Sequence, residues 1–213
     1  MKRWEFTGET KLHYGITLRR ISATIDFTLK CGIKVYKGEV GGWIEKEENL
    51  SGNAWVSGDA RVSGDARVYG DAVVSGDAWV YGNAWVYGNA RVYGDAVVSG
   101  DAMVYGNARV YGNARVYGDA VVYGDAMVYG NARVSGKNDI LWFKNCWSSG
   151  RCFTYTHSNK MWAVGCFYGT GEELISKAYK DSELSGKCYE ATVKYVEQIY
   201  AAIDAAKSKE AKE

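Results

Sequence analysis

A six-residue unit repeats along the middle of the chain with almost no variation. Starting at Leu50, the units read LSGNAW, VSGDAR, VSGDAR, VYGDAV, VSGDAW, VYGNAW and onward as far as Val134. Ala and the following Val are two positions apart, so they face the same way along an extended segment, while the variable residue and the Tyr or Ser face the opposite way. Gly followed by Asp or Asn tolerates positive φ, which turns the chain after every short strand.

Such a chain is predicted to coil rather than to form hairpins, because all its turns carry the same chemistry. Equivalent residues then stack in parallel strands about 4.8 Å apart, and three units per coil give a triangular prism with Val and Ala inside. A calcium-binding β-roll is the alternative. Its nonapeptide repeat contains GGxGxD, and the hexad period and the missing Gly pair argue against it.

An aliphatic residue is followed four positions later by a small one, as at Val68 and Ala72. This pattern resembles the hexapeptide-repeat, left-handed parallel β-helix superfamily. The left hand is taken from the resemblance alone, since crossovers between parallel strands are ordinarily right-handed. The segments TLRRI and GGWIE…NLS resemble the N-terminus of a branch that occurs in bacteria and very often in phages and prophages.

The fold class predicted is all-β with an α+β appendage. Open coil ends need caps, so residues 1–49 are expected to form an N-terminal β cap, 50–137 a left-handed parallel β-helix of about five triangular coils, and 138–213 a C-terminal α+β module. Within that module the segments DILWFKNCW, RCFTYTHSN and MWAVGCFYGT predict a three-strand meander. Thr170 is expected to N-cap a short helix, and a longer helix is expected from about Lys187.

Composition excludes several classes of partner. The chain has 26 Lys and Arg against 25 Asp and Glu, which gives no electrostatic reason to expect nucleic acid or an anionic membrane surface. The N-terminus lacks the apolar run of a signal peptide, and no stretch of about 18 apolar residues could span a bilayer. The five cysteines include no CxxC pair, so we expect reduced thiols in a cytoplasmic protein, or one in the host cytoplasm if a phage encodes it.

The resemblance implies acyl transfer from acetyl-coenzyme A as the default enzymatic activity, with a His on a coil or inserted loop as general base. Here His13 and His157 both lie outside the repeats, and no loop interrupts the hexads. Cys152 and His157 could imitate a nucleophile pair, but their segment is more simply a strand and a turn. We therefore expect no catalytic residues and no cofactor.

Two possible metal sites are disfavoured. Stacked Asp residues at one corner, such as Asp59 and Asp77, could recruit a cation, but Asn replaces Asp freely at equivalent positions, so these are expected to be turn residues. A zinc site on Cys146, Cys152 and Cys166 would have a spacing that matches no standard ligand pattern. No metal is expected.

Large apolar residues on the outer faces predict a homo-oligomer, because such residues are seldom left fully to solvent. Parallel prisms of the resembled superfamily commonly form trimers. The C-terminal helix also carries apolar residues at spacings of 4, 3, 4 and 3, which fits either packing on its own meander or assembly of an oligomer. The predicted interface residues are Trp79, Trp85, Val97, Met103, Tyr189, Val193, Val196, Tyr200 and Ile203.

Tyrosines and arginines at outward positions predict a site for a small anionic nucleotide. Tyr stacks on bases, and Arg binds phosphate through two parallel hydrogen bonds. The alternative is a cross-strand ladder that only stabilises the sheet. The predicted ligand-binding residues are Tyr69, Tyr87, Arg91, Tyr105, Arg109 and Tyr123.

These observations favour a non-enzymatic, oligomeric binding or scaffold protein of phage or prophage type. Its most concrete form is a sponge that sequesters a small nucleotide signal of host defence. The alternatives are a hexapeptide-repeat acetyltransferase that uses acetyl-coenzyme A, and a structural rod or virion component.

Overall fold

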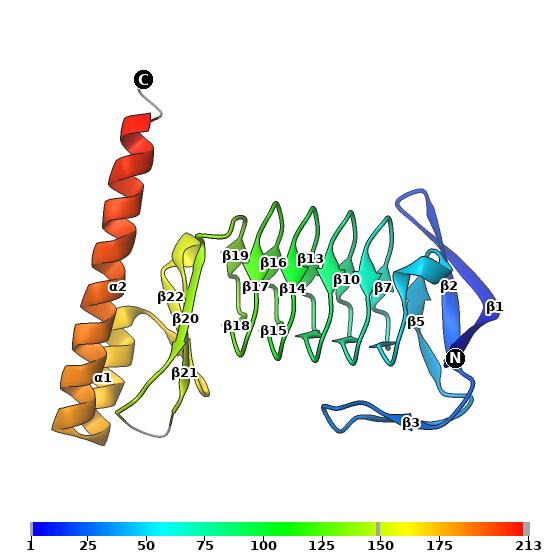
Figure 1. Cartoon of the computed structure of the whole chain (residues 1–213), viewed down its shortest axis with the longest axis horizontal. Helices are drawn as coiled ribbons and strands as arrows, with labels where there is room; N and C mark the ends of the chain where they lie inside the picture. The colour runs from blue at the N-terminus through cyan, green and yellow to red at the C-terminus, as the bar shows by residue number, and fades with distance from the viewer. Residues whose placement is uncertain (1, 148–149, 211–213) are drawn as a thin grey trace.

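The computed structural model describes residues 2–147 and 150–210. A long β-solenoid occupies the middle of the molecule, with a β-rich module at its N-terminal end and a module of strands and helices at its C-terminal end (Figure 1). The parallel β-helix predicted from the repeat is confirmed, with about five turns.

Every solenoid strand consists of one variable residue and the Val that follows it. Strands 18 residues apart pair in parallel, as Trp79 does with Val97, and this pairing builds three faces. The first face contains β7 (Arg61–Val62), β10 (Trp79–Val80), β13 (Val97–Val98), β16 (Arg115–Val116) and β19 (Arg133–Val134). The second face contains β8 (Arg67–Val68), β11 (Trp85–Val86), β14 (Met103–Val104) and β17 (Val121–Val122). The third face contains β6 (Trp55–Val56), β9 (Val73–Val74), β12 (Arg91–Val92), β15 (Arg109–Val110) and β18 (Met127–Val128).

The core of the solenoid is made of the Val and Ala of each repeat, which are almost completely buried. Glycine is required at the corners for two reasons. Gly94, for example, has a φ of +70°, which side chains rarely adopt, and a Cβ added there would lie only 3.1 Å from the Gly112 nitrogen. The corners therefore stack backbone directly on backbone.

The N-terminal module extends the first face beyond the repeats. The strands β1 (Trp4–His13) and β2 (Ile16–Ala23) form an antiparallel hairpin, and β5 (Val40–Ile44) joins β2 to β7. A short turn of helix, η1 (Glu47–Asn49), then leads into the first coil. The buried Asn49 amide donates hydrogen bonds to the carbonyls of Gly64 and Ala66 at 3.0 and 2.8 Å.

A second hairpin in this module, which we call the arm, consists of β3 (Phe27–Thr28) and β4 (Lys34–Val35). It extends beside the solenoid (Figure 1). Phe27 packs edge-on against Trp55 with ring centroids 5.8 Å apart. Trp55 and Val73 point outward from the third face, yet they are only 1% and 2% exposed. They share a buried cluster with residues of the arm, so their own chain covers them.

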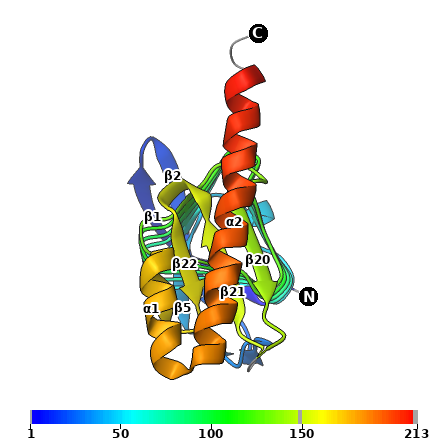
Figure 2. The same ribbon diagram turned by 90° about the vertical axis from the view of Figure 1, so that its left-hand side faces the viewer.

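The C-terminal module begins with an antiparallel meander of β20 (Ile140–Lys144), β21 (Cys152–Thr156), β22 (Met161–Val164) and β23 (Phe167–Gly169), with η2 (His157–Asn159) between β21 and β22. The meander is confirmed, but the third predicted segment is bent at Gly165, whose φ is +60°, into two strands. Two helices, α1 (Gly171–Asp181) and α2 (Glu183–Glu210), pack side by side on it (Figure 2). Thr170 caps α1 as predicted, and α2 begins earlier than Lys187.

The apolar seam of α2 faces its own meander. Its residues share one buried cluster with Phe153 and Trp162. Their burial inside one chain supports packing on the meander and argues against a role in an oligomer interface. The seam residues are Tyr189, Val193, Val196 and Tyr200, which are buried, and Ile203, which is partly buried. Along the described parts of the chain, no helix has the length and apolar character needed to cross a membrane.

The corner stacking predicts how glycine substitutions affect stability. We expect Gly94→Ala to lower the free energy of unfolding by about 1–3 kcal/mol more than Gly165→Ala, because only the first introduces an overpacked contact. Gly165 is the matched control, since its φ is also positive and a Cβ there meets nothing within 4 Å. Urea unfolding monitored by circular dichroism measures both variants, and equal losses would contradict the stacking argument.

Candidate ligand-binding sites on the solenoid

Four of the predicted ligand-binding residues form a ladder that follows the strands of the second face. Ring centroids along this ladder are 4.8, 4.9 and 5.8 Å apart, with interplanar angles of 2°, 10° and 20°. The ladder also contacts the variable residue of its own face, since Trp85 lies edge-on to the first ring at 6.2 Å. The ladder residues are Tyr69, Tyr87, Tyr105 and Tyr123.

The two predicted arginines lie elsewhere. Arg91 and Arg109 occupy β12 and β15 of the third face, where they are paired in register. Each is separated from the preceding tyrosine by a Gly–Asn corner, which turns the chain from one face to the next. The predicted ligand-binding residues therefore divide between two faces, because a tyrosine shares its face with the variable residue two positions before it.

The remaining interface candidates also divide between two faces. Trp79 and Val97 belong to the first face and Trp85 and Met103 to the second. Trp79 is already engaged within the chain, because Tyr14 from the β1–β2 hairpin stacks on it with centroids 5.7 Å apart and an interplanar angle of 12°. Trp85, by contrast, is 41% exposed. Trp85 is therefore the most exposed of these four candidates, while Val97 and Met103 are both partly buried.

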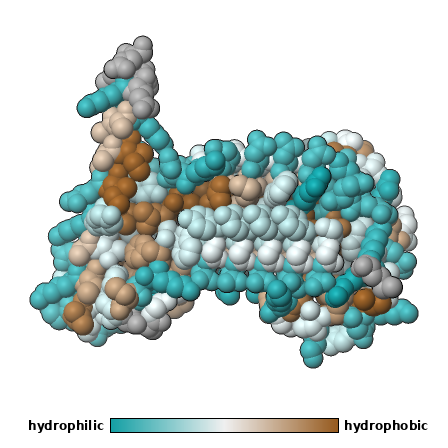
Figure 3. Space-filling view, viewed as in Figure 1, coloured by the Kyte–Doolittle hydropathy of each residue, from teal (hydrophilic) through white to brown (hydrophobic). Residues whose placement is uncertain are grey.

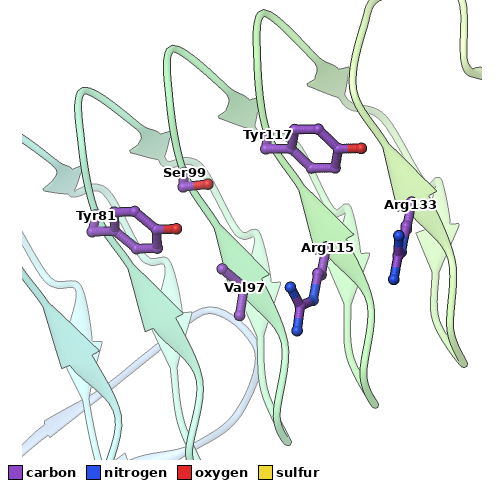
Figure 4. A pocket seen from close by; sticks show the side chains of 6 residues that line it. All are labelled: Tyr81, Val97, Ser99, Arg115, Tyr117 and Arg133. Carbon is purple, nitrogen blue, oxygen red and sulfur yellow. The ribbon is translucent and has the colours of Figure 1, made fainter.

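A hollow of about 260 Å³ lies on the first face where the tyrosine column is interrupted. The residues after successive strands are Ser63, Tyr81, Ser99, Tyr117 and Ser135. Ser99 forms the floor, and the rings of Tyr81 and Tyr117 lie on either side and point the same way along the solenoid (Figure 4). Two coils separate those rings, about 9.6 Å at the usual strand spacing.

Intact ladders elsewhere show what the interruption removes. On the third face, Tyr93, Tyr111 and Tyr129 stack with centroids 4.7 and 4.6 Å apart. A ring inserted above Ser99 would therefore meet a tyrosine on each side at close to this spacing. The hollow on the first face has the dimensions of one missing ring.

Two arginines line the same hollow. Arg115 and Arg133 are paired in register on β16 and β19, and like charges directly opposite each other destabilise a sheet. Neither forms an ion pair with a carboxylate anywhere in the part of the chain that the structure describes. The hollow thus combines an aromatic gap with two guanidinium groups that lack a counterion.

A second hollow, a cleft of about 330 Å³, lies on the third face beside the tip of the arm. Lys144 binds the carboxylate that lines this cleft, Asp125, at 2.6 Å, and Asn107 donates to the same carboxylate at 3.0 Å. These two hydrogen bonds hold the pKa of Asp125 below its ordinary value. The lining residues are Lys30, Cys31, Asn89, Arg91, Asn107, Arg109 and Asp125.

The Cys152 and His157 side chains have separate partners. The Cys152 thiol donates to the Asp125 carbonyl at 3.2 Å, and burial raises its pKa. The His157 Nε2 lies 3.0 Å from the Asp204 carboxylate, and its ring stacks on Tyr200 with centroids 4.3 Å apart. This histidine ties η2 to α2 instead of activating the thiol.

The sequence contains a signal for the first-face hollow, although none of its lining residues is among the predicted ligand-binding residues. When the hexads are written three to a line, Ser99 interrupts a column that has Tyr81 before it and Tyr117 after it. The arginine pair 115 and 133 stands in the neighbouring column. The third-face cleft has no such signal, because the repeat does not show where Lys30 and Cys31 of the arm come to lie.

Comparison with known families bears on the repeat alone. The matching family model is the YdcK Beta solenoid repeat. This match supports a parallel β-helix repeat family for the solenoid, and it does not extend to the flanking modules. The matched residues are 54–70, 60–76, 66–82, 84–100, 98–112, 108–124 and 122–136. No curated protein and no solved structure gives a match.

The Asp125 contacts predict a pH dependence. A carboxylate whose folded-state pKa is lowered adds stability above its unfolded-state pKa of about 3.9, and that stability is lost as the pH falls through the folded-state value. We expect Asp125→Asn to lower the thermal midpoint at pH 7 and the difference from the parent protein to vanish near pH 2. Circular dichroism melts across this range measure it.

Asp101→Asn is the matched control for this experiment. Asn83 donates to Asp101 across one coil at 2.9 Å, as Asn107 does to Asp125. Asp101 has no ion pair among the residues that the structure describes. Its substitution is expected to cause the smaller change at pH 7, and a pH-independent deficit for Asp125→Asn would contradict the prediction.

Proposed function

We propose that this protein is a non-enzymatic binding protein that holds a small anion with a flat aromatic ring, namely a nucleotide, in the hollow on the first face. The observation that carries the proposal is the position of Ser99 between Tyr81 and Tyr117, in a column that alternates serine and tyrosine. It leaves a gap one ring thick between Tyr81 and Tyr117, beside two arginines that have no carboxylate partner among the described residues.

The gap supplies the selectivity for a ring. Stacking of a base on an aromatic side chain contributes about 1–3 kcal/mol per base, and here a ring can stack on both of its faces. Tyr117 is 39% exposed while Ser99 is only 7% exposed, so a ligand would contact tyrosine at the walls and the serine hydroxyl at the floor. A chain with Tyr at position 99 would fill this space itself.

The arginines supply the selectivity for an anion. A planar guanidinium donates two parallel hydrogen bonds to phosphate, and Arg115 and Arg133 are adjacent on the same face as the gap. A bound phosphate also removes the repulsion between them. Base and phosphate of one small molecule can therefore be held at neighbouring positions on a single sheet.

Sequestration of a nucleotide signal of host defence is the biological form of the proposal that these features support. The resemblance of the N-terminal segment to phage and prophage proteins favours it, with a homo-oligomer, most simply a trimer, in the host cytoplasm. Acyl transfer from acetyl-coenzyme A has less support, since His13 packs on Trp79 with centroids 5.0 Å apart and His157 contacts Asp204. A structural rod would not explain the gap.

Isothermal titration with a panel of mononucleotides and cyclic nucleotides tests this proposal. At least one nucleotide is expected to bind, with affinity falling as salt rises. Tyr117→Ala is expected to weaken that affinity by about 1–3 kcal/mol, the value of one lost stacking contact. Failure of the whole panel to bind would overturn the proposal.

Ser99→Tyr is the sharper variant, because it completes the tyrosine column. We expect it to abolish nucleotide binding while leaving the fold intact. Ser75→Tyr is its control, since it places the same residue next to Tyr93 on the third face, away from the hollow. Unchanged binding by Ser99→Tyr would show that the gap is not the site.

A further inference from the structure

We infer that the cleft between the arm and the third face is a second anion site, one that binds the phosphate group of a ligand without an aromatic ring. This inference does not rest on the nucleotide site, because the two hollows lie on different faces and share no residue.

The third face is open at this place alone among its five strands. Toward the N-terminus, Trp55 and Val73 are buried beside the arm. Toward the C-terminus, β21 contacts β18, and the Met127 backbone N–H donates to the Thr154 hydroxyl at 3.0 Å. The window left between these covers contains the variable residues of β12 and β15, which are Arg91 and Arg109.

The window brings together two arginines, neither of which forms a close ion pair with a described carboxylate. Arg91 and Arg109 are paired in register, an unfavourable arrangement for like charges, and no ion pair involves either of them among the described residues. The Arg91 Nε is buried and has no hydrogen-bond partner in that part of the chain. Lys30, which belongs to the arm, lines the wall opposite the two arginines.

The carboxylates nearby are already engaged. Asp125 is bound by Lys144 at 2.6 Å, and Asp71 lies 3.8 Å from Lys30. An oxyanion with several acceptor atoms would satisfy both guanidinium groups at once and relieve their repulsion. Phosphate has that geometry, and arginine forks match it.

The lining residues indicate what the rest of the ligand is like. None of them is aromatic, in contrast to the first-face hollow. The amide ladder beside the arginines, in which Asn89 donates to Asn107 at 3.1 Å, presents only polar atoms. The cleft therefore suits inorganic phosphate or a phosphomonoester of a small polyol, and none of its lining residues offers an aromatic ring to a base.

Cys31 provides a reporter inside the cleft. It is a free thiol that lines the cleft, whereas Cys166 is a free, exposed thiol in the C-terminal module. The experiment measures alkylation rates of both thiols by mass spectrometry, in phosphate or glycerol phosphate against chloride at equal ionic strength. At about ten times its Kd, a bound anion is expected to slow alkylation of Cys31 about tenfold, because only the free fraction reacts, and to leave Cys166 unchanged.

Variants separate this site from the first. Arg109→Gln is expected to abolish the protection of Cys31, and since Arg109 is exposed, this variant should fold. Arg115→Gln and Ser99→Tyr, which change only the first-face hollow, are expected to retain the protection. Protection by glycerol phosphate as well as phosphate identifies a phosphomonoester site, and protection by phosphate alone identifies a site for the free ion. Equal alkylation of Cys31 in phosphate and chloride, or protection that survives Arg109→Gln, would overturn the inference.

Discussion

The hydrogen-bond ladder between strands 18 residues apart is the interaction on which the rest of the structure depends. Each strand donates to the coil that follows, as Tyr69 does to the Val86 carbonyl at 3.0 Å, and each corner does the same, as Asp71 does to the Gly88 carbonyl at 2.8 Å. This continuous register forces every outward side chain to stack on its equivalents. Chemistry on such a protein therefore comes in columns rather than in pockets.

The effect of a column on stability depends on which residue type is stacked in it. Tyrosines stacked at 4.6–4.9 Å stabilise one another and fill the surface. Arginines stacked at the same spacing repel one another. Binding sites are therefore expected where a tyrosine column is broken or where arginines coincide, and both hollows discussed above fit that rule. Because the repeat is so regular, a serine between two tyrosines of one column, such as Ser99, leaves a defined gap.

The part of the structure that could be predicted is the part set by local periodicity. Spacing of Val68 and Ala72 predicts the inward layer, and Thr170 predicts the start of α1. The left hand of the coil came from resemblance alone and stays a prediction, as does the phage or prophage origin. Tyr87 and Arg91 lie on different faces because a Gly–Asn corner turns the chain between them. A single hexad does not show whether its tyrosine lies on the face before the corner or on the face after it.

Contacts between distant segments could not be predicted in the same way. The heptad spacing of α2 is compatible with any apolar partner, and only the folded chain shows that the partner is Phe153 and its neighbours. Likewise, nothing in the repeat indicates that the arm covers Trp55. Neither contact could be predicted, and the reason is the same. Periodicity identifies the apolar face of a helix or strand, but it does not identify the distant segment that packs on that face.

Segments outside the repeats cover parts of the first and third faces, and this leaves the second face as the one best suited to contact another copy of the chain. The β1–β2 hairpin occupies part of the first face, and the arm and the meander occupy most of the third. On the second face, Trp85 and Tyr123 remain 41% and 44% exposed. Apolar side chains gather over the C-terminal half of the solenoid and continue onto the adjoining part of α2 (Figure 3). An oligomer that buried the second face would cover Trp85 and its tyrosine ladder and would leave both arginine-lined hollows open to solvent, so assembly and ligand binding would not compete for the same surface.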